Sequence, residues 1–462
     1  MTAAISKVTS FQSGTPKYRS IAADLAQAIL NGELAAGQKL PPHRVLAKRL
    51  GVTTGTVSRA YACLEEQALA QARVGDGTYV RTLDHSATGP ARDSSVVVID
   101  MAQNVAIPTG EAAALLRALA TLAQSEAHVG EVLQYQPEAG AQRHRQAGSH
   151  WLRRFGTSGA WNRVMVTHGA QHAIAGVLRA VTRPGDTLLT ESLSYPGMLA
   201  LARSMRLQVI GVEMDELGLL PDALDRAAQT FSSRMLFCSP TLHNPTGSTM
   251  SMERREAIAA VVRRRNLLVM EDAVHAVTVP DPLPALCTLV PEQSFLISSF
   301  SKVMAPGLRV GYLEASPQWL DKVAASIRAD CWMVAPLMPE IATIWLETGE
   351  AEHLIGLQRN AIAERLGEAR RLLGSIDVRS AEHYPHLWLP LPECWRAGPY
   401  AAALRQAGVL VRTMDHFAVG RTLTPHAVRI SLNRPTSLAQ LRQGLQTVVA
   451  VLNNPPAALM DP

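Results

Sequence analysis

The chain has 462 residues, 47% of them hydrophobic, and 44 Lys and Arg residues against 39 Asp and Glu residues, which gives a formal net charge of +5. This length predicts two or three domains. No run of about 18 apolar residues indicates a membrane helix and no signal peptide is recognisable, so we expect a cytosolic protein without a membrane partner. Five widely spread cysteines without CxxC spacing argue against a disulfide framework and against a zinc site.

The positive charge is concentrated at the amino end. Residues 1–81 contain ten Lys and Arg residues and five Asp and Glu residues, whereas the rest of the chain contains 34 of each sign. A basic appendage on a neutral body predicts a domain that binds nucleic acid. A solvated basic surface without a partner is the alternative.

Residues 17–81 carry the pattern of three helices and a hairpin. Apolar residues at helical spacing predict helices over residues 17–31, over 42–51, and from 53 or 54 to about 68. In residues 73–80 a glycine-rich turn between β-prone residues predicts a hairpin. A helix-turn-helix followed by such a hairpin, or wing, is typical of DNA-binding domains, so we expect one in residues 1–81. A three-helix protein-interaction module is the alternative.

The third helix of a winged domain enters the major groove, and basic residues at its flanks hold phosphates. We expect Arg44 and Lys48 to lie over the DNA backbone. The side chains expected at or near the bases are Thr53, Thr54, Thr56, Ser58 and Arg59. The segments GQKLPPHRVLA at residues 37–47, LGVT at 50–53 and GTYV at 77–80 make residues 16–81 resemble the winged-helix domain of GntR-type transcription regulators. The resemblance also places Gly77 on the DNA-binding surface. Many members have Arg where this chain has Thr54, so the bases that they contact do not transfer.

A linker and a larger domain follow. Residues 82–99 mix Ser, Thr, Gly, Pro and charged residues without periodicity, which is typical of a linker. Beyond them, in residues 100–462, β-type runs alternate with helical stretches, which predicts an α/β domain with a mostly parallel sheet. The strands are expected at residues 163–166, 187–190, 208–211, 234–237, 267–270 and 295–298.

Chemically distinctive residues follow these strands, at the edge where such sheets bind ligands. A helix start at residues 167–172 offers free backbone N–H groups to an anion. A carboxylate directly after an apolar strand, Asp272, is costly unless it meets a positive partner. The other residues of this kind are Tyr195, Asn244, Lys302 and Arg309. One Lys, one Asp, one Arg, an aromatic ring and an anion-binding helix start are what a pyridoxal phosphate site requires.

This order of residues resembles the fold type I aminotransferases, in particular the MocR-like subgroup, which joins that fold to a GntR-type winged helix. The resemblance implies that Lys302 holds the cofactor as a Schiff base, that Asp272 pairs with the ring nitrogen, that Asn244 donates to the 3-oxygen and that Tyr195 stacks on the ring. It also implies a smaller C-terminal α/β subdomain over about residues 331–462. The groups that would hold the phosphate are the amides of Ala170 and Gln171, Ser299 and Arg309.

Three further residues enter through the resemblance. Arg429 matches the arginine that binds a ligand carboxylate, and Tyr135 matches the tyrosine that reaches the phosphate of a neighbouring subunit, which implies a homodimer. Family members usually place a Tyr two or three residues after the Asp, where this chain has His275. Either His275 supplies the missing bond to the 3-oxygen, or the Schiff base has an unusual pKa and transamination is inefficient.

Two functions fit these observations. A complete DNA-binding domain and a complete cofactor site occupy one chain, which favours a transcription regulator that uses pyridoxal phosphate to sense an amino compound or the cofactor itself. A change of state in the large domain would then act on a DNA operator with two half-sites. The alternative is a pyridoxal phosphate-dependent aminotransferase with a secondary DNA-binding domain.

Overall fold

A computed structural model describes residues 16–31, 33–34, 38–66, 69–73, 77–80, 98–374, 376–420 and 424–455. The chain divides into two compact units, residues 1–95 and 96–462, and each is described by itself. The predicted linker lies outside the described residues as far as residue 97, and so does the turn of the predicted hairpin, residues 74–76. None of the helices in the described part of the chain combines the length and the apolar character that a membrane crossing needs.

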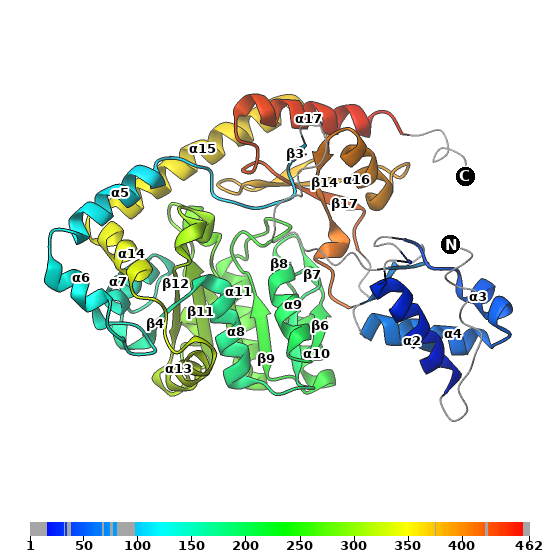
Figure 1. Ribbon diagram of the computed structural model, residues 1–462, viewed down its shortest axis with the longest axis horizontal. Coiled ribbons are helices and arrows are strands. Elements are labelled where there is room, and N and C mark those ends of the chain that lie inside the picture. Colours follow the sequence, from blue (N-terminus) through cyan, green and yellow to red (C-terminus); the bar gives the residue numbers. More distant parts are fainter. Residues whose placement is uncertain are drawn as a thin grey trace. The chain divides into compact units, whose positions relative to one another are not determined.

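In its described residues the first unit has three helices and a hairpin (Figure 1). Its elements are α2 (Lys17–Leu30), α3 (His43–Leu50), α4 (Thr54–Glu66), β1 (Ala70–Arg73) and β2 (Gly77–Val80). The helices bury one face each, with Leu25, Leu46 and Leu64 in a common core. Gly51 ends α3 in the left-handed conformation, at a φ of 63°, and so turns the chain toward α4. β1 and β2 pair antiparallel, which gives the helix-turn-helix and hairpin that the sequence predicts.

The second unit contains a seven-stranded sheet in the order β4-β12-β11-β10-β9-β5-β6. The six predicted strands are all present and parallel to one another, and an additional strand, β12, pairs antiparallel between β4 and β11. The strands are β4 (Val164–Thr167), β5 (Thr187–Glu191), β6 (Gln208–Val212), β9 (Met235–Cys238), β10 (Leu268–Asp272), β11 (Ser294–Ser299) and β12 (Gly311–Ala315). The α/β class with a mostly parallel sheet is therefore confirmed.

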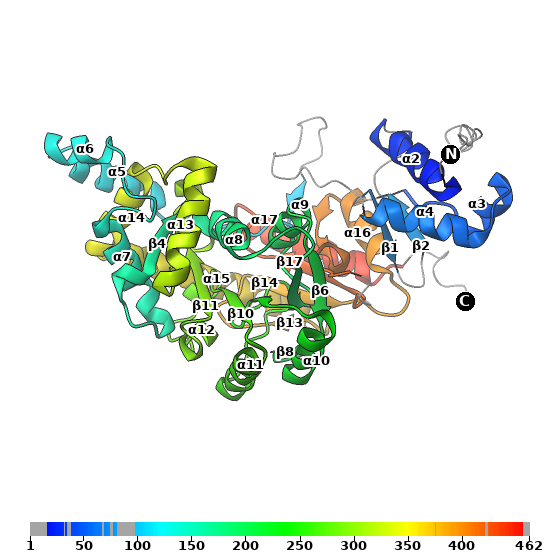
Figure 2. The ribbon, with the colours of Figure 1, turned by 90° about the horizontal axis from the view of Figure 1, so that it is seen from below.

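Both faces of this sheet are buried, which is why its strands are apolar almost throughout. Alternate residues of each strand join two separate cores, for example Met270 on one face and Val269 on the other. Helices α8, α9 and α13 cover the first face and α10 to α12 the second (Figure 2). The helices around the sheet are α5 (Glu111–Leu122), α6 (Glu126–Val132), α7 (Gln142–Leu152), α8 (Gly169–Val181), α9 (Pro196–Ser204), α10 (Pro221–Phe231), α11 (Met252–Arg265), α12 (Leu286–Leu289), α13 (Pro317–Cys331) and α14 (Leu337–Glu347).

A smaller subdomain has a four-stranded sheet of its own, in the order β13-β14-β17-β16. Its strands β14 and β17 bury Leu387 and Ile430 against helices on one face only. A short strand from the start of the unit, β3, pairs with β15 and joins the same core. The elements are β3 (Ile99–Asp100), α15 (Glu350–Leu373), β13 (Arg379–Ser380), β14 (His386–Pro390), α16 (Ala397–Gln406), β15 (Val409–Leu410), β16 (Arg412–Thr413), β17 (Ala427–Ser431) and α17 (Leu438–Leu452), with the two-residue strands β7 (Met214–Asp215) and β8 (Gly218–Leu219) in the large subdomain.

The boundary of this subdomain differs from the sequence-based estimate of about residue 331. Ile341 and Trp345 of α14 belong to the core of the large subdomain, whereas Ile362 of α15 belongs to that of the small one. The small subdomain therefore begins within α15, and it also takes in residues from the segment that follows the predicted linker, such as Ile99.

Candidate functional site

Lys302 lies just after β11, in a short helical turn whose first residue, Phe300, is fully buried. Its Nζ donates a hydrogen bond to the backbone oxygen of Asn104, at 2.9 Å. Burial and, next, the charge of Arg429 lower the pKa of Lys302 to about 8, although Asp272 acts in the opposite direction. An amine with so low a pKa is neutral, and hence nucleophilic, in a useful fraction of molecules near neutral pH.

Asp272 ends the neighbouring strand, β10, and is buried. Its Oδ1 accepts a hydrogen bond from the backbone N–H of Val274, at 3.1 Å. Burial raises the pKa of Asp272 to about 6, while the Val274 N–H and Lys302 favour the charged form. A buried carboxylate of this kind gains from a further positive partner, and a protonated pyridine nitrogen is such a partner.

His275 lies three residues beyond Asp272, and it too is buried. Its Nε2 accepts from the side-chain amide of Asn104, at 3.3 Å, which leaves the proton on Nδ1. Burial, together with the charges of Lys302 and Arg429, lowers the pKa of His275 to about 3. The imidazole is therefore neutral and has one N–H to donate, which is what a bond to a ring oxygen needs.

An anion-binding arrangement lies at the start of α8, where the N–H groups of Ala170 and Gln171 are free of helical partners. Arg309 crosses this helix end, because its Nη2 donates to the backbone oxygen of His168 at 3.1 Å and its Nη1 to Ser301 Oγ at 3.2 Å. Gly169 has a φ of 74°, and a Cβ there would lie 2.8 Å from Arg309 Nη2. Only glycine lets the guanidinium lie against this helix end.

Two other expected residues lie at this end of the site. The ring of Tyr195 lies over Gly197, where a Cβ would come within 2.4 Å of Tyr195 Cζ and within 2.6 Å of Gln171 Oε1. That Oε1 is buried and has no hydrogen-bond partner. Ser299 is buried, and its hydroxyl accepts from the N–H of Ser301 at 3.2 Å. The hydroxyl that contacts Arg309 is therefore that of Ser301 rather than that of Ser299.

Arg429 reaches the site from β17 of the small subdomain and is 5% exposed. Its Nη1 donates to Asn244 Oδ1 at 2.7 Å and its Nη2 to the backbone oxygen of Ala102 at 2.6 Å, while its Nε is buried without a partner. Burial lowers the pKa of Arg429 to about 10. Within the described part of the chain this guanidinium bonds to an amide and a carbonyl oxygen rather than to a carboxylate, so a ligand carboxylate would supply its missing counter-charge.

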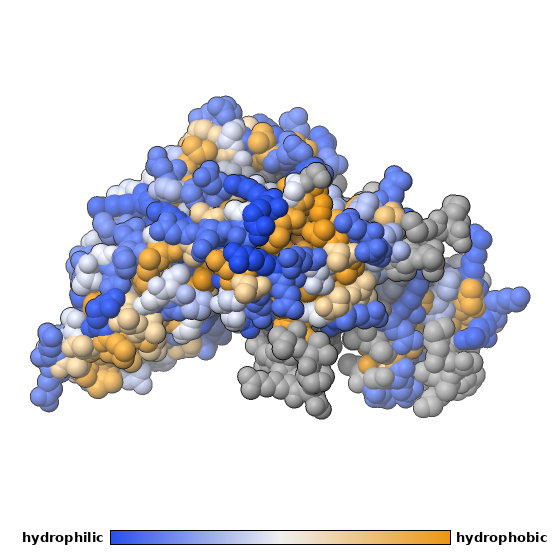
Figure 3. Space-filling model, turned by 90° about the horizontal axis from the view of Figure 1, so that it is seen from above, coloured by the Kyte–Doolittle hydropathy of each residue, from blue (hydrophilic) through white to orange (hydrophobic). Residues whose placement is uncertain are grey.

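Tyr135 lies outside this group of residues. It is 82% exposed, in the segment between α6 and α7, and its ring lies 6.2 Å from that of Trp332. Leu133 and Leu116 are also exposed, and Figure 3 shows apolar side chains gathered at the end of the unit that carries α5 and α6. An exposed apolar surface of this kind indicates contact with another molecule.

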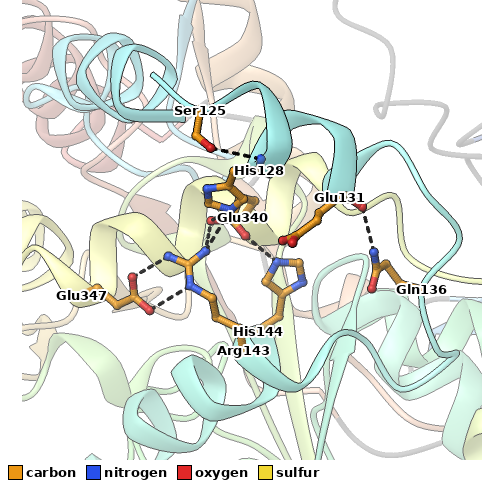
Figure 4. Close-up of polar contacts among 8 residues, drawn as sticks. All are labelled: Ser125, His128, Glu131, Gln136, Arg143, His144, Glu340 and Glu347. Atoms are coloured by element: carbon orange, nitrogen blue, oxygen red, sulfur yellow. Dashed lines mark hydrogen bonds and ion pairs between the residues drawn. The ribbon is translucent and has the colours of Figure 1, made fainter. Parts of the chain in front are cut away.

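The helix before Tyr135 is held by a buried carboxylate, Glu340 of α14 (Figure 4). Glu340 bonds to His144 Nε2 at 2.8 Å, to His128 Nε2 at 3.1 Å and to Arg143 Nη1. Arg143 also pairs with Glu347, at 2.5 Å. One carboxylate thus joins α6 and α7 to α14, and it fixes the base of the segment that carries Tyr135.

The first unit presents a basic surface on α3 and α4. Arg44, Lys48 and Arg49 are exposed and line a shallow hollow with Val45. These side chains are free to approach phosphates, as a backbone-binding role requires.

At the start of α4, Thr54 and Arg59 are exposed, whereas other expected contacts have protein partners. The hydroxyl of Thr53 accepts from the N–H of Thr56 at 3.2 Å and bonds to the hydroxyl of Thr56 at 2.9 Å. Ser58 Oγ bonds to His43 Nδ1 at 2.9 Å, which joins α4 to α3. In the wing, Gly77 is exposed, and a Cβ there would lie 3.0 Å from the side chain of Lys39.

Four residues of the site were not predicted from the sequence: Asn104, Ser301, Tyr384 and His386. Asn104 lies in a segment without periodicity, and no pattern points to it. Tyr384 and His386 pack edge to face, with ring centroids 4.8 Å apart, and each ring also lies near that of His275. His386 begins a β-type run, which a search for strands in the C-terminal part would have found.

The residues of the second unit fit pyridoxal phosphate. An amine with a lowered pKa matches its aldehyde, and a buried carboxylate matches its ring nitrogen. A neutral imidazole matches its ring oxygen, and an arginine beside a helix start matches its phosphate. The cradle at Gly169 and the unpartnered Gln171 Oε1 at the same helix start are independent signs of a ligand there.

Comparisons with known proteins agree with both units. The model of the family "Aminotransferase class I and II" matches residues 97–448, and that of "Bacterial regulatory proteins, gntR family" matches residues 17–80. The chain is 29% identical over 439 residues, 95% of each chain, to the HTH-type transcriptional regulator YdeF of Bacillus subtilis. It is 26% identical over 411 residues, 88% of this chain and 92% of the relative, to the vitamin B6 salvage pathway transcriptional repressor PtsJ of Salmonella typhimurium.

Two solved structures with a similar fold are aminotransferases. An archaeal alanine:glyoxylate aminotransferase is 22% identical and has a TM-score of 0.70, over 78% of this chain and 91% of that one. The kynurenine aminotransferase of Pyrococcus horikoshii is 20% identical and has a TM-score of 0.71, over 78% of this chain and 91% of that one. At these identities the likeness concerns the fold of the second unit.

Proposed function

The chain belongs to the class I and II aminotransferase family over residues 97–448 and to the gntR family of bacterial regulatory proteins over residues 17–80. From this premise we propose that it is a transcription regulator, which senses an amino compound, or pyridoxal phosphate itself, through Lys302. The observation that carries the proposal is Arg429. A buried guanidinium that has no carboxylate partner among the described residues, beside a half-buried lysine, suits a ligand with both an amino and a carboxyl group.

Each residue of the site has a role in this proposal. The cofactor supplies an aldehyde that condenses with amines and a ring that takes up negative charge when its nitrogen is protonated. Lys302 would attach it, Asp272 would hold the proton on its ring nitrogen, and Asn244 and His275 would donate to its 3-oxygen. Tyr195 would cover its ring. The groups that would hold its phosphate are the amides of Ala170 and Gln171, Arg309 and Ser299.

The contacts of Arg429 suggest how a ligand changes the state of the protein. Arg429 lies on the small subdomain, and its bond to Asn244 joins that subdomain to the large one. A carboxylate bound by Arg429 would compete with Asn244 for the guanidinium and so shift the balance between two arrangements of the subdomains.

We further propose that the regulator acts in the cytoplasm as a homodimer. The exposed Tyr135, with the apolar surface around it, supports a contact in which each subunit lends its Tyr135 to the partner's phosphate site. A dimer carries two DNA-binding units, so its operator would have two half-sites. Arg44 and Lys48 would contact phosphates, and Thr53, Thr54, Thr56, Ser58, Arg59 and Gly77 would lie at or near the DNA.

The test is to titrate the full-length protein, loaded with cofactor, against the DNA upstream of its own gene, with and without amino acids. We expect a salt-sensitive preference for that DNA over unrelated DNA, and a change in affinity when an amino acid binds. Lys302→Ala should lose both the visible absorbance of the bound cofactor and the response to amino acids, while it still folds and binds DNA. Transamination at about 1 s⁻¹ or faster, without any preference for that DNA, would instead identify the chain as an enzyme.

A further inference from the structure

The polar face of the small sheet carries buried groups without partners. Residues that are paired on adjacent antiparallel strands share a face, and so do residues two positions apart along a strand. His386 pairs with Ser431, and Trp388 pairs with Arg429, so all four side chains lie on one face of β14 and β17. The opposite face is apolar and belongs to the core.

His386 and Ser431 have no role in the site as described so far. His386 is 1% exposed, and within the described residues neither of its ring nitrogens has a hydrogen-bond partner. Ser431 is fully buried, and its hydroxyl has no partner among these residues either. On the same face, Nε of Arg429 also lacks one, although the two other nitrogens of that guanidinium are bonded. Buried polar groups are nearly always paired, so unpaired atoms on three adjacent residues indicate a ligand.

These groups lie close to the reacting end of the site. The ring of His386 is 6.0 Å from that of His275, and His275 bonds to Asn104, whose backbone oxygen accepts from Lys302. Burial lowers the pKa of His386 well below its ordinary value, and the charges of Arg429 and Lys302 act in the same direction. The imidazole is therefore neutral, with one N–H donor and one nitrogen acceptor, and the Ser431 hydroxyl adds a group that can do both.

We propose that His386 and Ser431 form a second recognition site, which binds an uncharged hydrogen-bonding group on the side chain of an amino acid effector while Arg429 binds its carboxylate. The inference rests on the proposed function and narrows it. A donor and an acceptor side by side match a carboxamide or a hydroxyl. A second carboxylate does not match, because the neutral imidazole and the hydroxyl offer it no charge of opposite sign.

The test compares pairs of amino acids of equal shape that differ in one polar group. The pairs are L-asparagine with L-leucine and L-homoserine with L-norvaline, and L-aspartate serves as the charged counterpart of L-asparagine. Binding to the cofactor-loaded protein is followed by calorimetry and by the change in visible absorbance. We expect the polar member of at least one pair to bind about tenfold more tightly than the apolar member, because the apolar one leaves the two residues unpaired.

Two variants and a control test whether the preference for polar ligands depends on His386 and Ser431. Ser431→Ala and His386→Phe should each reduce the ratio between polar and apolar members toward one, with little loss for the apolar member. Ser316→Ala is the matched control, because Ser316 is also fully buried and its hydroxyl also lacks a partner, but it lies at the start of α13. The control should keep the wild-type ratio.

Three results would overturn the proposal: no preference in the wild type, an unchanged ratio in both variants, or tighter binding of L-aspartate than of L-asparagine. In each case an intact absorbance band that still responds to amino acids leaves the proposed function standing. If none of the amino acids alters the band or the heat of binding, the proposed amino acid effector fails as well, and the second site with it.

Discussion

Gly169 combines a left-handed backbone conformation with a close contact to the guanidinium of Arg309. Its φ of 74° is one that other residues rarely adopt, and a Cβ would come 2.8 Å from Nη2 of Arg309. Gly169→Ala should therefore displace the guanidinium from the start of α8. We expect the affinity for pyridoxal phosphate, measured by absorbance titration, to fall about tenfold or more, which corresponds to the loss of about one charge-assisted hydrogen bond.

Gly185 provides the matched control for that substitution. It has a φ of 94°, but no atom lies within 4 Å of the position that a Cβ would take. Gly185→Ala should cost only the strain of the backbone, about 1–2 kcal/mol of the free energy of unfolding. Its cofactor affinity should match that of the wild type. Equal affinities in all three proteins would show that Arg309 does not hold the phosphate.

The low pKa of Lys302 makes a prediction about pH. Only the neutral amine attacks an aldehyde, so the rate at which the cofactor-free protein captures pyridoxal phosphate should rise with pH and level off above about 8. An ordinary lysine would keep accelerating to a pH near its usual pKa of 10.5. Because Arg429 is one cause of the lowered pKa, Arg429→Gln should move the midpoint upward. Stopped-flow absorbance measures both, and a midpoint at the ordinary lysine pKa in the wild type would contradict the assignment.

The residues of the site divide into those that the sequence could reveal and those that it could not. Asp272 and Lys302 follow adjacent parallel strands, and such strands deliver their ends to one edge of the sheet, so pattern and spacing suffice. Asn104 and His386 reach the same place from the start of the unit and from the other sheet. Their approach depends on how the two subdomains pack, which no local periodicity encodes.

Among the elements, α6 is joined to α14 through one buried side chain, Glu340. Burial alone would raise the pKa of Glu340, but hydrogen bonds from His144 and Arg143 outweigh it and lower the pKa to about 2. Glu340→Gln removes the buried charge that bonds to His144 and Arg143, while Arg143 keeps its pair with Glu347. We expect the free energy of unfolding to fall by about 1–3 kcal/mol near neutral pH, as measured by chemical denaturation.

The pH dependence of this effect follows from the sign of the shift. A lowered pKa stabilises the fold above the ordinary value of 4.5, and this contribution is lost as the pH falls toward about 2. The difference between the wild type and Glu340→Gln should therefore shrink over that range. Glu347→Gln is the control, because Glu347 pairs with the same Arg143 but is about half exposed, and it should cost less than about 1 kcal/mol. A similar cost for both variants would contradict the central role of Glu340.

The strand β12 is the one strand of the large sheet that the sequence did not predict. The six parallel strands are continuous apolar runs, each bounded by turn residues, and they could be found without a structure. β12 contains Glu314 and begins two residues after Arg309, so its composition resembles that of a loop. It is a strand because the free edges of β4 and β11 both pair with it, a tertiary effect that outweighs local preference.

For the whole molecule, we expect the exposed surface around Tyr135 to join two copies of the chain. Leu133, at the end of α6, is 77% exposed, and Trp332 beside Tyr135 is 52% exposed. Apolar side chains gathered at such a level of exposure cost free energy in water unless they are covered. A second copy would cover them and would bring a Tyr135 to each phosphate site, so assembly, cofactor binding and DNA binding should fail together.

Leu133→Asp tests that linkage. The carboxylate would have to be buried without a partner in the dimer, so light scattering should find a monomer. Its affinity for the cofactor should fall, because the partner's tyrosine is lost, and its affinity for a two-half-site operator should fall by about tenfold or more, because the two DNA-binding units no longer act together. Leu217→Asp is the control: Leu217 is 46% exposed near β8, far from α6 in both ribbon views, and this variant should stay dimeric. A dimeric Leu133→Asp with full cofactor affinity would place the interface elsewhere.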